Sequence, residues 1–272
     1  MSPSAGTPEL IELVAGARVY DLAQPLVNGM PQSPNHPRFH LALARRHGDV
    51  VREGGGSAAG EILVLGGHVG THVDALCHVS QDGLLHGGLR ADDAQRGGRF
   101  SELGIDTVAP FLGRGVLLDV AALHGVDVLP GGTVITARDL EAAAGRAGVG
   151  VRTGDVVLVR TGWARHWADA EAFVGLESGV PGPGEEAAAW LASHGIRATG
   201  ADTIAYEALA PGAGHAQLPV HRLLLVERGI HIVETLQLEE LAADGVGEFA
   251  FVAAPLKLVG GTGSPLRPLA LV

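Results

Sequence analysis

Three histidines and one aspartate lie within eleven consecutive residues, and all four side chains can bind a divalent metal ion. Residues 68–78 read HVGTHVDALCH, and the candidate ligands are His68, His72, Asp74 and His78. Imidazole nitrogen and carboxylate oxygen together suit borderline or hard divalent ions. A bound divalent ion lowers the pKa of water towards neutrality and polarises a carbonyl group. The stretch therefore predicts a metal site that could hydrolyse a small carbonyl compound.

The spacing of these residues favours an extended segment over a helix. On a helix, His68 and His72 would share a face while Asp74 would point away. On an extended segment, His68, His72, Asp74 and His78 all lie on one side. Three glycines among residues 66–70 also oppose a helix. We expect an irregular extended segment that leaves a strand-like run at residues 62–65 and directs its even-numbered side chains into one cavity. A lone histidine is more often an ordinary core or surface residue, but this set on one parity favours ligation.

Two further candidate ligands, His221 and Glu234, lie far downstream. Glu234 belongs to an apolar, strand-like run at residues 230–236, where an unpaired carboxylate is costly. A metal or another cation would account for this carboxylate, and a salt bridge or a surface position is the alternative for either residue. His231 lies on the opposite strand parity, and we expect it to face solvent or another subunit.

The ligand types suggest how the ions would be held. His68, His72 and Asp74 would hold one ion with positions left open for water and substrate. Asp74 or Glu234 could bridge to a second ion that His221 also binds. The expected cofactor is Zn²⁺ or Mn²⁺, one or two ions per chain, because nitrogen and oxygen ligands without thiolate do not select between these metals.

Other side chains are candidates for proton transfer or for contact with a substrate. His78 lies beyond the tight cluster, so we expect it to be the catalytic general base or proton shuttle, which typically contributes about 10²–10⁴-fold to the rate. Cys77 has odd parity, which favours a small buried residue over a reactive thiol. Met30, Trp163 and Tyr206 are the candidate substrate-binding residues, since each would help to shape the pocket.

The composition describes a globular protein and argues against a nucleic-acid surface. The chain has 272 residues, 46% of them hydrophobic, which is ample for a large core. Its net charge is −11, Lys257 is the sole lysine, and the arginines form no basic stripe. One cysteine excludes an intrachain disulfide and a multi-thiolate zinc site.

We expect no contact with a membrane. No run approaches the roughly 18 apolar residues that a transmembrane helix needs, and the first residues lack the basic-then-apolar pattern of a signal peptide. The sequence therefore predicts a cytoplasmic protein that binds a small-molecule substrate and neither nucleic acid nor membrane.

The elements that must position these residues alternate between strands and helices in the second half of the chain. A short helix within residues 1–17 and a strand near 18–22 come first, followed by a Pro-rich loop at 25–39 and a Gly-rich segment at 47–60. Thr136 and Asp139 resemble a capping box that opens a helix through about residue 147. Further helices are expected at 184–194 and 218–227, and strands at 115–120, 155–160, 196–200, 230–236 and 248–254. This alternation is typical of α/β proteins, and we predict a single domain over residues 1–272.

The metal-binding stretch closely resembles the His-x-Gly-Thr-His-x-Asp-x-Pro-x-His signature of the metal-dependent cyclase family, which includes bacterial kynurenine formamidases and isatin hydrolases. Leu76 stands where that family usually has proline. Similar blocks extend the resemblance over nearly the whole chain, at residues 21–25 (DLAQP), 30–31 (MP), 160–163 (RTGW), 200–203 (GADT) and 263–268 (GSPLRP). The resemblance implies an α/β fold, a single compact domain with a β-barrel-like or swivelling β/β/α core.

The same resemblance carries expectations about function and assembly. It makes His221 and Glu234 the expected distal ligands, and it implies a homodimer or homotetramer with pockets near subunit contacts. The leading hypothesis is a metal-dependent hydrolase, similar to an arylformamidase or a cyclic amide hydrolase, that cleaves a small amide, formamide, lactam or lactone with metal-activated water. The alternatives are a metal-dependent cyclase or lyase acting on a small carbonyl compound, and a non-catalytic metal-binding protein.

Overall fold

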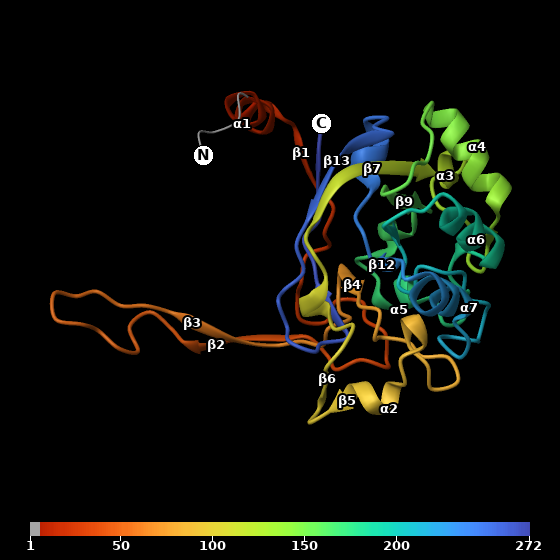
Figure 1. Ribbon diagram of the computed structural model, residues 1–272. Coiled ribbons are helices and arrows are strands. Elements are labelled where there is room, and N and C mark those ends of the chain that lie inside the picture. Colours follow the sequence, from red (N-terminus) through yellow and green to blue (C-terminus); the bar gives the residue numbers. More distant parts are fainter. Residues whose placement is uncertain (1–5) are drawn as a thin grey trace.

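A curled sheet of nine strands forms the centre of the molecule (Figure 1). The computed structural model describes residues 6–272. In spatial order the strands are β1 (Val19–Asp21), β15 (Leu269–Leu271), β13 (Glu248–Ala253), β7 (Phe111–Asp119), β9 (Val156–Arg160), β11 (Ala198–Ala201), β12 (His231–Glu234), β4 (His72–Asp74) and β14 (Gly263–Pro265). Strands β7, β9, β11 and β12 run parallel, and the strands outside them pair antiparallel. The mixed α/β fold and its half-barrel sheet agree with the prediction.

Helices cover one face of this sheet and leave the other face to line the inside of the curl. The covering helices are α3 (Val120–Leu123), α4 (Ala137–Ala147), α6 (Glu185–Ser193) and α7 (Pro219–His221), which continues as a π-helix over Arg222–Arg228. In β9, Val157 and Val159 pack with the helices, while Val156 and Leu158 pack inside the curl. The alternation follows from strand geometry, and burial on both faces explains the continuous apolar run VVLV.

The predicted capping box is present at the start of α4. The Asp139 amide donates to Thr136 Oγ1 at 3.3 Å, and the Thr136 amide donates to Asp139 Oδ2 at 2.8 Å. At the other end Gly148 adopts a φ of 67°, a left-handed conformation that glycine reaches without strain. These signals fixed both ends of the helix, as the sequence predicted.

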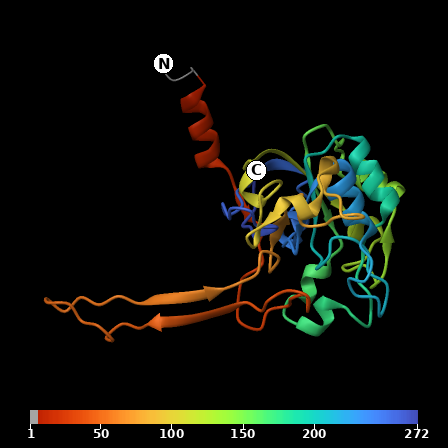
Figure 2. The same ribbon diagram turned by 60° about the horizontal axis from the view of Figure 1, so that its bottom comes forward.

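A long two-stranded hairpin leaves the body of the molecule and was not anticipated (Figures 1 and 2). It consists of β2 (His40–Arg45) and β3 (Gly60–Val64), which pair antiparallel. The strand-like run at 62–65 and the Gly-rich segment at 47–60 belong to this hairpin, so that run is not part of the central sheet. Helix α1 (Thr7–Gly16) also stands away from the body, and none of its residues is buried.

Shorter elements complete the described part of the chain. They are η1 (His86–Gly88), α2 (Ala91–Ala94), β5 (Gln95–Arg96), β6 (Arg99–Phe100), η2 (Ile105–Thr107), β8 (Val134–Ile135), η3 (Trp163–His166), α5 (Ala170–Val174), β10 (Gly182–Pro183) and α8 (Glu239–Ala243). Within residues 6–272 no helix has the length and apolar character to cross a membrane. The cytoplasmic location and the single domain over residues 1–272 stay predictions.

Candidate metal centre

Strand pairing brings the two halves of the candidate site together. Strands β4 and β12 are antiparallel neighbours, and their register sets His72 directly opposite Glu234. Directly opposed residues of such a pair project from the same face of the sheet. Asp74, two residues after His72, shares this face, which is the one that the helices cover. Residues 162 positions apart in the sequence therefore meet because of one short strand pair.

The prediction of an extended segment over residues 68–78 is correct only as far as Asp74. Strand β4 ends there, and a turn closed by the His78 amide on the Ala75 carbonyl, at 2.9 Å, redirects the chain. The turn brings the His78 ring back against His68, with ring centroids 3.8 Å apart in a stacked arrangement. His78 thus reaches the cluster through a turn and not by strand parity.

Two groups of potential ligands share Asp74. In the first group, ligand atoms of His68, Asp74 and His78 lie within 4.8 Å of one another, and in the second those of Asp74, His221 and Glu234 do. His221 Nε2 lies 3.1 Å from Glu234 Oε1 and 3.6 Å from Asp74 Oδ2.

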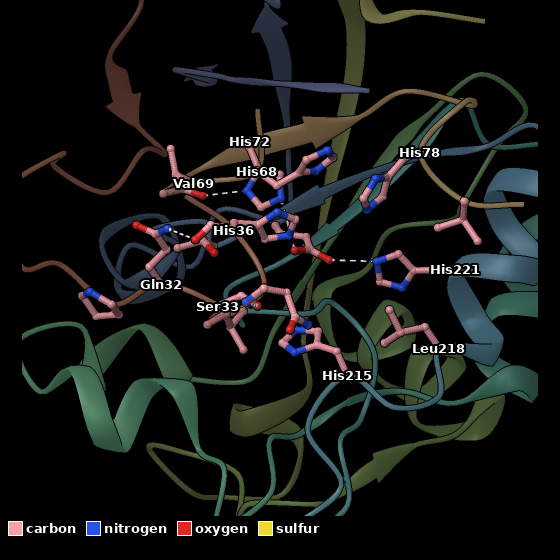
Figure 3. A pocket seen from close by; sticks show the side chains of 17 residues that line it. Gln32, Ser33, His36, His68, Val69, His72, His78, His215, Leu218 and His221 are labelled. Atoms are coloured by element: carbon pink, nitrogen blue, oxygen red, sulfur yellow. Dashed lines mark hydrogen bonds and ion pairs between the residues drawn. The ribbon is translucent and has the colours of Figure 1, made fainter. Parts of the chain in front are cut away.

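His72 connects to both carboxylates at the centre of the cluster. Its Nε2 lies 3.3 Å from Glu234 Oε2 and 3.7 Å from Asp74 Oδ1. The structure therefore gathers His68, His72, Asp74, His78, His221 and Glu234 into one cluster. The sequence predicted this grouping except for His78, which was expected beyond the tight cluster. Figure 3 shows the four histidines of the cluster at the pocket.

Backbone and carboxylate partners orient two of the imidazoles. His72 Nδ1 lies 2.7 Å from the Gly70 carbonyl oxygen, to which it donates, so Nε2 is left to face the cluster. His221 Nδ1 lies 2.7 Å from Glu207 Oε1, and Glu207 also accepts hydrogen bonds from the amides of Val220 and His221. Metal-binding histidines commonly have such a partner on the second ring nitrogen, which fixes the ring orientation.

Glu207 was not singled out from the sequence. Its signal was a lone carboxylate inside the apolar run IAYEALA at residues 204–210. Because it is 2% exposed, it needs buried hydrogen-bond donors, and the start of α7 supplies two of them. The same reasoning that selected Glu234 would have found it.

The donor set fits a divalent cation, and one atom in the cluster requires a partner. Asp74 is 1% exposed, and its Oδ2 is buried with no hydrogen bond. A buried, unpaired carboxylate oxygen is costly. Imidazole nitrogens and carboxylate oxygens at this density are the ligands that zinc and manganese take. A cation bound beside Asp74 would satisfy that oxygen, so the residues present fit a metal site.

Charges within the cluster keep its carboxylates ionised. Burial alone would raise the pKa of Asp74, but the nearby imidazoles of His78, His68 and His72 outweigh burial and lower it well below its usual range. The pKa of Glu234 falls to about 2, because the hydrogen bonds from His221 and His72 outweigh its burial. Both side chains are therefore anions at neutral pH, the form that binds metal.

Neighbouring carboxylates raise the pKa of two histidines of the cluster, and burial lowers the pKa of a third. Burial would lower the pKa of His221, but Glu207 and Glu234 raise it to about 10, and Glu234 and Asp74 raise the pKa of His72 in the same way. Burial dominates at His78 and lowers its pKa to about 4. His78 is therefore neutral at neutral pH, as a general base or a ligand must be.

A cavity of about 290 Å³ opens onto this cluster (Figure 3). Two further histidines lie in its wall and were not predicted as site residues. His36, from the Pro-rich loop, stacks on His68 with ring centroids 5.0 Å apart, and His215 comes from the segment before α7. Both have a lowered pKa because they are partly buried. The remaining lining residues are Pro31, Gln32, Ser33, Asn35, His68, Val69, Gly70, His72, His78, Val79, Ile204, Leu218, His221, Glu234 and Thr235.

Comparison with known proteins shows which family the chain belongs to. The family model described as putative cyclase matches residues 20–208. An isatin hydrolase of Roseibium aggregatum is 33% identical over 214 residues, covering 77% of this chain and 73% of the relative. The chain belongs to the cyclase family. A kynurenine formamidase of Bacillus cereus is 26% identical over 247 residues, covering 91% of this chain and 94% of the relative.

A solved structure agrees with this cyclase-family assignment. The crystal structure of a novel cyclase superposes with a TM-score of 0.85 at 30% identity, covering 98% of this chain and 93% of that chain. The similarity to hydrolases of C–N bonds and the buried metal-ligand cluster together identify the cyclase-family chain as a metal-dependent hydrolase. The prediction of a hydrolase, made over a non-catalytic metal-binding protein, is confirmed.

The three predicted substrate-binding residues of this cyclase-family chain do not line the cavity. Tyr206 is fully buried in the core and bonds Thr199 Oγ1 at 2.9 Å. Trp163 is 4% exposed, and its indole nitrogen donates to the Phe173 carbonyl at 2.8 Å. Met30 lines a neighbouring cavity beside Gln32 and His36. Each was expected to shape the pocket, but its place in the sequence gives no direction for the side chain.

Two side chains near the ligands, His231 and Cys77, pack against the protein interior. His231 was expected to face solvent or another subunit, and this expectation was wrong. Its parity points it to the inner face of the curl, where Nδ1 lies 2.9 Å from the Asp74 carbonyl oxygen and the ring meets Phe111 edge-on. Cys77 is buried, as expected, and burial raises the pKa of its thiol to about 11.

Proposed function

We propose that the cluster binds one or two ions of zinc or manganese and that the chain hydrolyses a C–N bond of a small amide there. The observation that carries the metal assignment is Asp74, a buried carboxylate shared by two donor groups, with one oxygen that accepts no hydrogen bond. Its position between the groups suits a bridging ligand. Two donor groups around one carboxylate favour two ions, and zinc has a slight advantage at such a site.

The proposed roles of the residues follow from their surroundings. His72, Asp74, His221 and Glu234 hold the cation, with His68 as a further ligand. The divalent ion supplies Lewis acidity, which polarises a carbonyl and lowers the pKa of water. Glu207 holds the His221 ring in place through Nδ1.

His78 is the proposed general base. It is neutral at neutral pH, it borders the cavity, and it stacks on His68, so its ring can accept a proton close to the ligands. The same ring would then donate this proton to the leaving nitrogen, so that His78 acts first as general base and then as general acid. Its ligand atoms also lie close to Asp74, so direct ligation of a second ion by His78 is the competing role.

The walls of the cavity favour a small, planar, partly apolar substrate. Pro31, Val69, Ile204 and Leu218 supply apolar surface, while His36 and the cluster supply polar contacts. A volume of about 290 Å³ accommodates a molecule the size of a substituted ring. Among relatives, the isatin hydrolase has the higher identity, at 33% against 26% for the kynurenine formamidase. We therefore place a cyclic amide fused to an aromatic ring first and an aryl formamide second.

Substrate hydrolysis is tested by incubating the purified chain with isatin and with N-formylkynurenine in water labelled with oxygen-18. A hydrolase incorporates one labelled oxygen into the product, whereas a cyclase or lyase incorporates none. Ring opening of isatin that depends on zinc or manganese supports the first choice. Turnover of the formamide alone favours the second, and turnover without label in the product contradicts hydrolysis.

A further inference from the structure

A second cavity, here called the side cavity, adjoins the cavity that opens onto the metal-ligand cluster. Its volume is about 430 Å³, so it is the larger of the two. The two cavities share Gln32, Ser33 and His36 of the Pro-rich loop as lining residues. In Figure 3, Gln32 lies on the side of the cluster's cavity opposite His221. A substrate that occupied only the cluster's cavity would leave this adjoining space unused.

The wall of the side cavity carries a positive charge and no negative one. Arg38 and His40 line it, and none of its lining residues is Asp or Glu. This wall contrasts with the whole chain, whose net charge is −11. Within residues 6–272 the Arg38 guanidinium has no ion pair and no hydrogen bond. It is therefore free to bind an anion, and a guanidinium is particularly suited to a carboxylate.

Side-chain hydrogen bonds hold the backbone around Arg38 in place. Gln32 Nε2 donates to the His36 carbonyl at 2.9 Å, and Gln32 Oε1 accepts from the Phe39 amide at 3.0 Å. The Asn28 side chain accepts from the Leu41 amide at 2.8 Å and donates to the Leu41 carbonyl at 2.9 Å. Residues 36–41 are therefore fixed at both ends without a ligand, which reduces the entropy lost when a ligand binds.

Apolar side chains supply another part of the wall. Met30, Phe39 and Val174 line the side cavity, and the first two pack with Val69 in one buried cluster. Binding sites for small molecules typically combine apolar walls with a few polar groups that fix the orientation of the ligand. The side cavity has this composition, with carbon surface for a short chain and Arg38 for a charged group on it.

We propose that the substrate of this chain is a small aromatic amide with a carboxylate on a short chain, and that Arg38 binds this carboxylate in the side cavity. The inference rests on the proposed hydrolase function and specifies its substrate, because the carboxylate is an addition to the ring amide or aryl formamide that reacts at the cluster. Two parallel N–H···O bonds from the guanidinium would fix the direction of the substrate. Arg38 is thus a specificity residue that does not touch the reacting atoms.

The first test measures the binding of product-like molecules and needs no turnover. Isothermal titration calorimetry compares kynurenine with kynuramine, which is the same molecule without its carboxylate. The unaltered chain should bind kynurenine about tenfold more tightly, the effect of one charge-assisted hydrogen bond. R38M removes the guanidinium and should bind both molecules equally, while R38K should keep part of the preference. The matched control is R45M, because Arg45 is exposed on β2 and lines neither cavity, so the preference should persist.

The binding measurement can overturn the proposal in three ways. Equal affinity of the unaltered chain for kynurenine and kynuramine would show that no group binds the carboxylate. A preference that R38M retains would show that the metal or another side chain binds it. Arg38 is exposed, so salt should screen its interaction with the carboxylate. A preference that added sodium chloride leaves unchanged would therefore contradict an ion pair at this residue.

The second test uses turnover to separate this inference from the proposed function. The substrates are N-formylkynurenine and N-formylkynuramine, which again differ only in the carboxylate. The ratio of their kcat/KM values should favour N-formylkynurenine and fall about tenfold in R38M, mainly through KM, while R45M keeps the ratio. An equal fall for both substrates in R38M would contradict the carboxylate site. Failure of the unaltered chain to hydrolyse these formamides or isatin would contradict the proposed function, and the binding preference would still decide whether the side cavity holds a carboxylate.

Discussion

At the scale of single residues, Asp74 determines the chemistry of the cluster. It contacts His68 at 2.7 Å, lies within reach of His72 and His221, and retains one buried oxygen, Oδ2, that accepts no hydrogen bond. Its anionic form is stabilised by the surrounding imidazoles, which lower its pKa. A shared, ionised carboxylate at the centre of histidines is what a divalent cation needs and what a folded core otherwise avoids.

Replacement of Asp74 by asparagine should remove bound metal and activity while the fold is kept. Asparagine keeps the size of the side chain but loses the charge that binds the cation, and it removes one like-charge contact with Glu234. We expect metal content to fall below a tenth of an equivalent, hydrolysis to fall at least a thousandfold, and the melting temperature of the chelated protein to change little. Elemental mass spectrometry and a rate assay measure these effects.

A matched control for this variant is D82N. Asp82 is exposed and has a φ of 52°, a backbone conformation that asparagine also adopts readily. Metal content and rate should equal those of the unaltered chain. Equal metal content in D74N and D82N would exclude Asp74 as a ligand.

Glu207 should act on the metal through His221. In E207Q the side chain keeps its shape, but its amide cannot match a carboxylate that accepts hydrogen bonds from His221 Nδ1 and two backbone amides. Loss of such a partner typically weakens metal affinity by about 10–100-fold. Titration of the chelated protein with zinc should show this loss, with the rate at saturating zinc falling less than in D74N. Unchanged affinity in a folded E207Q would contradict the role.

The ligand residues of the site could be predicted from the sequence, but the side chains that contact them could not. His68, His72, Asp74, His221 and Glu234 stood out because ligand-type side chains were dense or lay in apolar runs. The partners Glu207 and His36 depend on which loops fold back over the strands, and residue spacing contains no such information. The directions of Trp163 and Tyr206 were missed for the same reason.

At the scale of elements, the three-residue strand β4 positions the central ligands of the site. It lies between β12 and β14, and its register with β12 sets His72 opposite Glu234. Alternation along the strand then directs Asp74 to the same side. Long elements such as α4 and β9 could be predicted from caps and apolar runs, whereas β4 exists because its neighbours pair with it.

The capping box of α4 gives a prediction about stability that leaves the site intact. In T136A the Thr136 hydroxyl no longer accepts from the Asp139 amide, which typically costs about 1 kcal/mol of unfolding free energy. Urea denaturation should show this loss, with metal content unchanged and with exposed Ser80→Ala as the control. A loss below a quarter of this size would show that the cap contributes little.

The effect of T136A should depend on pH. Burial raises the pKa of Asp139, but hydrogen bonds from Thr136 and His124 outweigh it, so the pKa lies below its ordinary 3.8. A carboxyl with a lowered pKa in the folded state stabilises the fold above its unfolded value and loses that effect as the pH falls through the folded value. The difference between T136A and the unaltered chain should therefore shrink as the pH falls below 3.8.

At the scale of the whole molecule, the hairpin formed by β2 and β3 is connected directly to the pocket. Strand β2 begins four residues after His36, which stacks on His68, and β3 ends four residues before His68. Both ends of the hairpin therefore continue directly into the wall of the cavity.

The fold of the body was predictable because its strands and helices alternate in a pattern typical of α/β proteins, and the resemblance to the cyclase family implied a barrel-like core. The hairpin of β2 and β3 was not, since its strand-like run at 62–65 has the same apolar character as a buried strand. Local sequence does not distinguish an apolar strand that is buried in the body from one that stands away from it.

The most direct test of the account measures metal and turnover together. The purified chain is stripped with a chelator, and zinc or manganese is returned stepwise while bound metal per chain and the hydrolysis rate are recorded. The account predicts that the rate is lost on stripping and returns in proportion to metal, saturating at one or two equivalents, and that D74N regains neither. Full hydrolysis by the stripped chain, or metal binding without any recovery of rate, would contradict it.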